Sequence, residues 1–146
     1  MVRQLLLPLI TVLLLAGQAS AQQSERFDQF ELHYSVVNTT FLAPKVAATY
    51  GITRSKQRAI LNLAVREHLP EGGTAGRAMQ LKGRTWDLIQ REQVLQFQQV
   101  REGDAVYSIA EFEFLGDEWH NFEVHFRPEG ATKTYTFKLK HKVYEQ

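Results

Sequence analysis

Hydrophobic and polar residues alternate along much of this chain, which is the pattern of β-strands with one buried face. The clearest case places Phe122, Val124 and Phe126 on one face, and a second run with the same period follows at residues 135–140. The turn residues Pro128-Glu129-Gly130 lie between the two runs and predict a hairpin. Three further strands are expected at residues 29–36, 59–65 and 106–114.

Two parts of the chain are harder to assign. Between residues 79 and 100 the alternation changes parity at Trp86 and Leu88, which predicts two strands, near 79–90 and 92–100, joined by a bulge or tight corner. A helix over 88–97 is the alternative. Residues 68–77 contain Pro70 and three glycines, which predict a loop. The total of about seven strands predicts an all-β fold, a single antiparallel β-sandwich of immunoglobulin-like appearance.

One short segment between the first two strands has helical rather than strand signals. Pro44 suits the first position of a helix, and Gly51 stands where helices commonly end in a left-handed residue. We therefore predict a short helix over residues 44–50. The preceding residues 38–40 offer short polar side chains that can cap backbone donors. Phe41 and Leu42 are expected to staple the helix to one open end of the sandwich, where it would cover a sheet edge or plug the core.

The first 21 residues have the features of a cleavable signal peptide. Arg3 precedes an apolar run from Leu5 to Leu15, and Ala19-Ser20-Ala21 supplies the small residues that a signal peptidase requires. A membrane anchor is the alternative, but the apolar run is too short to span a bilayer. We expect cleavage after Ala21, which leaves residues 22–146 as one β-sandwich domain without a transmembrane span.

The absence of cysteine narrows the possible chemistry. The 146 residues contain no cysteine, which excludes cysteine nucleophiles, CxxC redox centres, thiolate metal sites and a lipoprotein anchor. A cysteine-free exported chain of this kind is expected in a Gram-negative periplasm. The 17 basic and 16 acidic residues give a net charge of +1, so the chain carries no bulk charge that would attract nucleic acid.

The segment NTTFLAPKVAATYGITRSK, residues 38–56, resembles a signature of the uncharacterised proteobacterial family of domain of unknown function 4426 (DUF4426). In that family the block is N-T/S-x-F-L-x-P-x-x-A-x-x-Y-G-I-x-R-S-K. The stretch VREGDAVY at 100–107 and the C-terminal strands ending in Tyr144 are also similar. The resemblance covers most of residues 22–146. It implies a signal peptide and one small periplasmic domain, and it implies no activity, cofactor or catalytic residue.

A metal site can be imagined on the polar faces of the strands. His33 lies beside Glu31, and His125 shares its face with Glu123, so His33, Glu123 and His125 would converge if their strands paired. No closely spaced pair of the HxH or HExxH kind supports this site. Solvated histidines on polar strand faces are the simpler interpretation, and we predict no metal and no cofactor.

Nucleophilic and acid–base catalysis also lack a recognisable set of residues. Ser35, Ser55 and Ser108 have no GxSxG context, and Ser108 lies in an apolar row where a small core residue is expected. Glu111 and Glu113 are two apart on one strand face, where the polar face of a sheet explains them without a catalytic role. No catalytic residue is predicted, and an enzyme is the less favoured interpretation.

The segment around residues 38–56 has the densest mixture of aromatic, basic and hydroxyl side chains in the chain. Loops held by a rigid sandwich often carry binding sites. The candidate binding residues are Asn38, Thr39, Thr40, Phe41, Tyr50, Arg54, Ser55 and Lys56. The alternative is a solvated crossover whose cations bond carbonyl groups at the end of the helix.

The terminal strand offers a second basic feature. Lys138, Lys140 and Lys142 share one face, where they would protect a sheet edge from pairing or contact an anionic partner such as lipid headgroups. Two functions remain after these steps. The favoured one is a non-enzymatic binding or accessory module that engages a protein or envelope component through residues 38–58 or a sheet edge. The alternative is a metal-binding protein or a hydrolase that uses polar-face histidine and glutamate residues.

Overall fold

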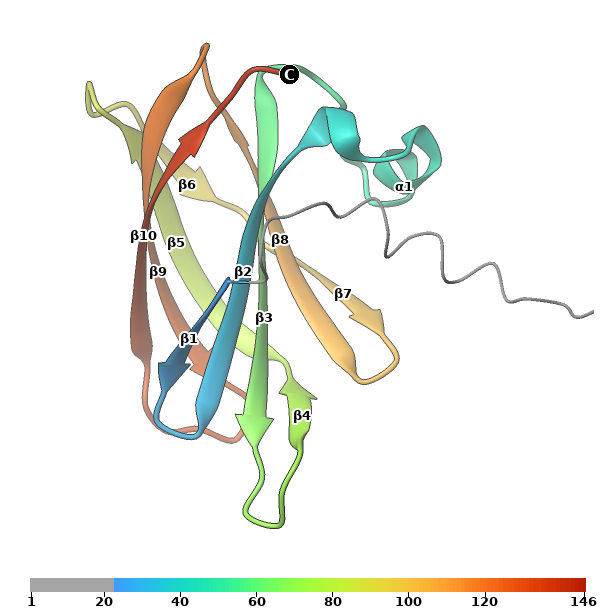
Figure 1. The fold of residues 1–146 in the computed structure, drawn as a ribbon, viewed down its shortest axis with the longest axis vertical. Helices are drawn as coiled ribbons and strands as arrows, with labels where there is room; N and C mark the ends of the chain where they lie inside the picture. Colours follow the sequence, from blue (N-terminus) through green and yellow to red (C-terminus); the bar gives the residue numbers. More distant parts are fainter. Residues whose placement is uncertain (1–22) are drawn as a thin grey trace, which may run out of the picture.

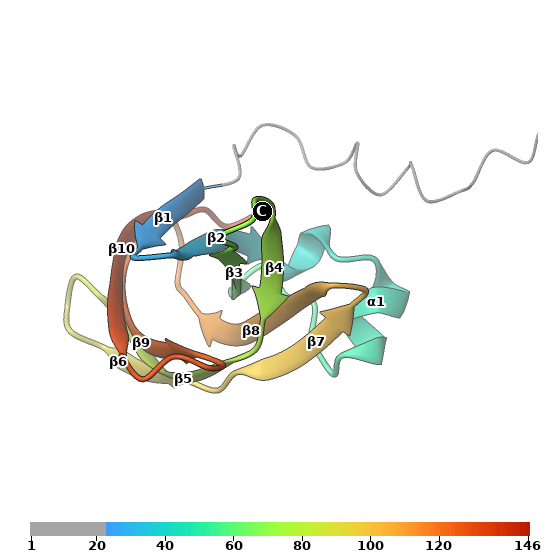
Figure 2. The same cartoon turned by 90° about the horizontal axis from the view of Figure 1, so that it is seen from below.

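The computed structural model describes residues 23–146, and the predicted signal peptide with its cleavage site lies outside the described residues. Ten strands form two antiparallel sheets that face each other as a sandwich (Figures 1 and 2). The prediction of an all-β, antiparallel sandwich with one short helix after the first predicted strand, at residues 29–36, is confirmed, and a further short strand, β1, precedes that strand. Over residues 23–146, no helix has the length and apolar character needed to cross a membrane.

The strands divide unequally between the two sheets. The six-stranded sheet has the order β1 (Gln23–Phe27), β2 (Phe30–Asn38), β3 (Arg58–His68), β8 (Ala105–Glu113) and β7 (Gln98–Glu102), with β4 (Thr74–Arg77) also paired to β3. The four-stranded sheet has the order β10 (Tyr135–Val143), β9 (Glu118–Pro128), β5 (Met79–Asp87) and β6 (Glu92–Leu95). The lysine-rich β10 is therefore an edge strand.

The apolar rows of the two sheets meet in one core, as the alternation requires. The six-stranded sheet contributes Leu61, Leu63 and Phe112, and the four-stranded sheet contributes Phe122 and other aromatic residues. The rings of Phe112 and Phe122 stack edge to face across the core, with centroids 5.1 Å apart. Ser108 is buried in the same row, which agrees with its assignment as a small core residue.

The expected number of strands, about seven, is too low because the short strands carry too few residues to show an alternation. Within residues 68–77, expected to be a loop, Thr74–Arg77 forms β4. A Cβ atom on Gly76 would lie 2.1 Å from the carbonyl oxygen of Asp104, so this glycine permits close packing inside a strand. No helix spans 88–97, where a turn at Asp87–Arg91 leads into β6.

The segment between β2 and β3 contains a 3-10 helix, η2 (Thr39–Phe41), and the predicted α-helix, α1 (Pro44–Thr49). Pro44 occupies the first helical turn, and Gly51 has the left-handed φ of 67°. Neither helix has a side-chain cap. The side chain of Asn38, the N-cap residue of η2, bonds elsewhere, and the N-cap residue of α1 is Ala43.

The position of α1 differs from the expectation. The helix covers the outer face of the six-stranded sheet, where Ala47 and Ile52 pack on Ile60 of β3 and Ile109 of β8 to form a second, smaller core. It does not plug the open end of the sandwich (Figure 2). Leu42 packs against this second core, whereas Phe41 is 66% exposed and staples nothing.

The packing of Leu42 and the exposure of Phe41 predict different effects of the two residues on stability. Replacing Leu42 with alanine should lower the free energy of unfolding by roughly 1–2 kcal/mol, because a partly buried leucine loses its apolar contacts. The matched variant Phe41→Ala should change it by less than about 0.5 kcal/mol, because the ring is already in water. Urea denaturation of the two variants measures the difference, and equal destabilisation would place Phe41 in a packed contact instead.

Candidate functional site

Five segments of the chain meet at one end of the sandwich, which we call the upper end. It comprises residues 38–42, 54–57, 87–91, 114–119 and 143–146, and it lies at the top in Figure 1. Hydrogen bonds tie these segments together across long distances in the sequence. The hydroxyl of Thr40 donates to the carbonyl oxygen of Gln146 at 2.9 Å, and the amide N–H of Glu145 donates to Asp117 at 3.0 Å.

Most of the candidate binding residues from the sequence lie at this end, but their polar groups hold the chain together. The hydroxyl of buried Thr39 accepts the Ser55 N–H and donates to the Ser55 carbonyl, both at 2.9 Å. The side-chain amide of Asn38 donates to the Tyr144 carbonyl, and Arg54 donates to the Thr40 carbonyl at 3.0 Å. These contacts account for the mixture of polar side chains without a ligand.

Three other candidates from the same segment behave differently. Tyr50 lies away from the upper end, beside α1, where it packs against the second core and its carbonyl accepts a bond from Gln98. Lys56 and Phe41 are exposed to solvent. The structure therefore bonds Thr39 to Ser55 and Thr40 to Arg54, ties Asn38 to the C-terminal segment and leaves Tyr50 apart.

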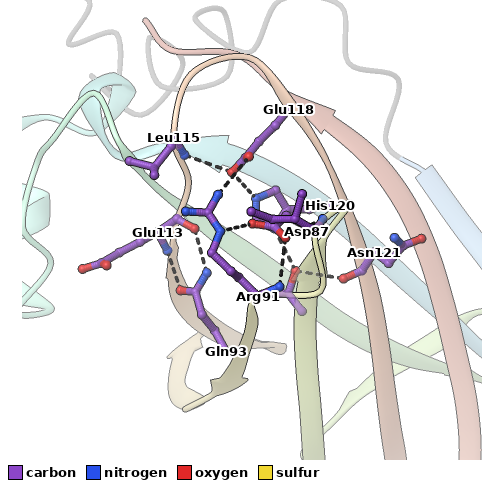
Figure 3. A network of polar contacts seen from close by, with 10 residues as sticks. Asp87, Arg91, Gln93, Glu113, Leu115, Glu118, His120 and Asn121 are labelled. Carbon is purple, nitrogen blue, oxygen red and sulfur yellow. Dashed lines mark hydrogen bonds and ion pairs between the residues drawn. The ribbon is translucent and has the colours of Figure 1, made fainter.

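A buried polar network lies directly beneath the loops of the upper end (Figure 3). His120 on β9 is 1% exposed, and its Nε2 atom lies 2.9 Å from Oε1 of Glu118. Its Nδ1 atom lies 3.2 Å from the hydroxyl of Thr85, which itself donates to the Asn121 carbonyl at 2.8 Å. The hydroxyl of Thr85 and the carboxylate of Glu118 thus engage both ring nitrogens of His120.

The network continues from Glu118 to the turn between β5 and β6. Arg91 lies 3.5 Å from Glu118 and donates its Nε–H to Asp87 at 2.6 Å. The second oxygen of Asp87 accepts the backbone N–H groups of Ile89 and Arg91. Glu118 also accepts the N–H of Leu115 at 2.9 Å, so one carboxylate joins the β5–β6 turn to the β8–β9 loop.

The pKa of Asp87 reflects these contacts. Burial by itself would raise the pKa, but the N–H and guanidinium of Arg91 and the N–H of Ile89 outweigh it. The pKa of the carboxyl group therefore lies below its ordinary value. Asp87 is ionised at neutral pH and holds the turn by charge-assisted bonds.

Sequence reasoning did not find this network, although the sequence contains a signal for it. Thr85 and His120 stand at positions whose parity places them on the core face, together with Phe122. A polar side chain in an apolar row needs partners, because an unpaired buried polar group is costly. These residues therefore mark a buried network, and every member that the structure describes is engaged with another.

The loops above the network carry most of the exposed apolar side chains. Among residues 23–146, eight large hydrophobic side chains are exposed, and only Val46 and Val94 lie outside the upper end. The remaining six are Phe41, Leu88, Ile89, Leu115, Trp119 and Tyr144. Leu88 and Ile89 form the tip of the β5–β6 turn with exposed fractions of 62% and 73%, and Leu115 on the neighbouring loop is 55% exposed.

The residues of the imagined metal site are not brought together. His33 lies on β2, facing outward from the six-stranded sheet, whereas Glu123 and His125 face outward from β9 of the other sheet. His125 lies 3.4 Å from Glu123 and 2.9 Å from the hydroxyl of Thr136, and His33 lies 3.8 Å from Glu31. Across residues 23–146, no three His, Asp or Glu side chains converge as a metal ion would require.

A comparison with protein families identifies the fold. The model of DUF4426, a domain of unknown function, matches residues 24–146. The chain belongs to the DUF4426 family. The resemblance stated from residues 38–56 is thereby confirmed. A search of curated proteins finds no sequence match.

Solved structures place this DUF4426 domain among related sandwiches. It is similar to a DUF4426 family protein from Pseudomonas aeruginosa PAO1, with 27% identity, a TM-score of 0.72, and 85% of this chain and 95% of that chain covered. FetP from uropathogenic Escherichia coli strain F11 has 12% identity, a TM-score of 0.60, and coverage of 86% and 95%. A copper-bound FetP variant has 11% identity, a TM-score of 0.58, and coverage of 86% and 92%. At this identity FetP shares the fold alone.

The network of the DUF4426 domain has a measurable pH signature. Because the folded pKa of Asp87 is lowered, its charge stabilises the fold above the unfolded pKa of about 3.9 and ceases to do so as the pH falls through the folded pKa. Wild-type protein should have a higher urea midpoint than Asp87→Asn at neutral pH, and the gap should close below about pH 4. A gap of the same size at both pH values would show that the charge is not what stabilises the turn.

Proposed function

We propose that this DUF4426 domain is an exported, non-enzymatic binding module that engages a component of the cell envelope through its upper end. The observation that carries the proposal is the concentration of exposed apolar side chains there, on Leu88, Ile89, Leu115 and their neighbours. Soluble proteins rarely expose a large apolar patch unless it serves to bind a partner. The periplasm is the proposed location.

The proposed location has two supports. The pattern of residues 1–21 is that of a cleavable signal peptide. FetP, which has the same fold, was produced for its crystal structure in the periplasm of Escherichia coli. Both agree with a sandwich that holds itself together by burial, without disulfides.

The loops that would bind are held in place before any partner arrives. The β5–β6 turn is fixed by Asp87 and Arg91, and the β8–β9 loop is fixed by the bond from Leu115 to Glu118. A side chain displayed on an ordered loop loses little further conformational freedom on binding, which favours affinity. Six exposed apolar side chains at one end of the sandwich, three of them on these two ordered loops, are suited to recognition.

A metal-binding protein or a hydrolase remains the alternative, and the geometry supports it less. The solved FetP variant holds copper, but the histidines considered in this chain face outward from opposite sheets. The buried His120 is bonded to Glu118 and Thr85 and has no open side toward a substrate. The binding module is therefore the function that the described residues favour.

Site-directed photocrosslinking in living cells tests the proposal. A photoreactive amino acid in place of Leu88 or Leu115 should give adducts with an envelope component, because both positions lie on the proposed contact surface. The same amino acid at Val46 or Val94, which are exposed elsewhere, should not give these adducts. Adducts of equal yield from all four positions, or none from Leu88 and Leu115, would overturn the proposal.

A further inference from the structure

We propose that the upper end docks on an anionic phospholipid bilayer. Leu88, Ile89 and Leu115 enter the apolar layer, and Lys140 and Lys142 lie against the phosphate groups. This inference rests on the proposed function and names the chemistry of its partner. It is carried by the apolar, aromatic and cationic side chains that lie together at this end of the molecule.

The tips of two loops carry exposed apolar side chains. Leu88 and Ile89 are adjacent on the β5–β6 turn, which Gln90 closes with a left-handed φ of 64°. Leu115 stands on the β8–β9 loop, and the contact between Arg91 and Glu118 holds the two loops together. The polar groups near these side chains already have partners, so the tips can leave water without stranding the Arg91 or Glu118 charge.

Two exposed aromatic rings lie beside these loops. Trp119 is the second residue of β9, and Tyr144 directly follows β10 at its upper end, and both rings are exposed. Tryptophan and tyrosine favour the boundary between the apolar layer and the headgroups, because one part of each ring is apolar and another is polar. Their position next to the tips matches that boundary.

A lysine ammonium group lies over each of these rings. Nζ of Lys140 lies 5.3 Å from the ring centre of Trp119, and Nζ of Lys142 lies 5.3 Å from that of Tyr144. Lys138 follows on the same face of the β10 edge strand, about 7 Å further down at the rise of a strand. Anionic headgroups attract lysines placed at this depth.

The charge of the upper end is mixed, which sets a condition on binding. Glu118 is paired with Arg91, but Asp117 and Glu145 also lie at this end. Attraction by the lysines alone is therefore weak. Docking needs both the apolar tips and the cations, which is the usual requirement for stable attachment at a bilayer surface.

The combination of side chains also favours a bilayer over a protein groove. A bilayer presents an apolar layer, an interface and anionic headgroups in fixed sequence. The apolar tips of two loops, the exposed rings of Trp119 and Tyr144, and the lysines over both rings offer one kind of group for each of these layers.

Vesicle sedimentation with the exported protein tests the inference. Wild-type protein should sediment with vesicles of phosphatidylethanolamine and phosphatidylglycerol, and much less with vesicles of phosphatidylethanolamine and phosphatidylcholine. The double variant Leu88→Ser/Ile89→Ser should lose at least about tenfold in affinity, because two apolar side chains no longer leave water. The control Val46→Ser alters an exposed valine on α1 and should bind like wild type.

The lysines need their own comparison. Lys140→Gln/Lys142→Gln should bind anionic vesicles more weakly than wild type and with less dependence on salt. The matched control Lys45→Gln/Arg101→Gln removes two exposed cations from α1 and β7 and should leave binding unchanged. Thermal unfolding of each variant confirms that the fold is intact. Equal weakening by both double variants would show that net charge, and not this surface, governs binding.

Tryptophan fluorescence reports how deeply Trp119 enters the bilayer. The chain has two tryptophans, so Trp86→Phe leaves Trp119 as the single reporter. Its emission should shift to shorter wavelength on anionic vesicles, and lipids brominated near the headgroup should quench it. Trp119→Phe leaves Trp86, on the outer face of the same sheet, which should shift less. Vesicle binding without any shift of Trp119 would overturn the proposed orientation.

Failure of this inference can be told from failure of the proposed function. If wild-type protein binds neither vesicle but Leu88 and Leu115 crosslink in cells to one protein, the bilayer is wrong and the binding module stands. If neither position gives adducts and no vesicle is bound, both proposals fall. Vesicle binding that is lost in the Leu88→Ser/Ile89→Ser variant and kept in the Val46→Ser control supports both proposals.

Discussion

The carboxylate of Glu118 holds the upper end of the sandwich together. One oxygen accepts the N–H of Leu115 and faces the buried ring of His120, and the other faces Arg91, which in turn bonds Asp87. Two loops that are distant in sequence thereby share one set of charges. Without the Glu118 carboxylate, the buried Nε2 atom of His120 would lack a hydrogen-bond partner, at a cost of about 1–3 kcal/mol.

The strands of the core were predictable because a period of two records which face is buried. The short strands were not, since four or five residues carry too little alternation, and in β4 the glycine that suggested a turn serves a close approach to Asp104. The polar network was also missed. Thr85 and His120 occupy core-facing positions, and their partners come from a turn and a loop that no local pattern joins to them.

For α1, the bounds of the helix depend on neighbouring residues, whereas its location depends on residues that are distant in the sequence. Pro44 and Gly51 act on the backbone next to them, so the existence and bounds of α1 followed closely from the sequence. Its location depended on Ile60 and Ile109, two apolar residues on otherwise polar strand faces. Outward-facing isoleucines need a cover, and α1 and the residues beside it supply one. The contacts of the candidate binding residues in this segment also depend on distant parts of the chain. Most of their polar groups form hydrogen bonds to carbonyl groups that are far away in the sequence.

The exposed apolar tips are the feature that folding alone does not explain. The core would be complete with polar residues at positions 88, 89 and 115, since these side chains point into solvent. Exposing them carries a risk of aggregation that a sandwich of this size could avoid. The network beneath them stabilises the loops and leaves the side chains uncovered. A surface that covers the tips in use resolves this conflict, and a bilayer does so while also placing Trp119 and Lys140 at the depths that suit them.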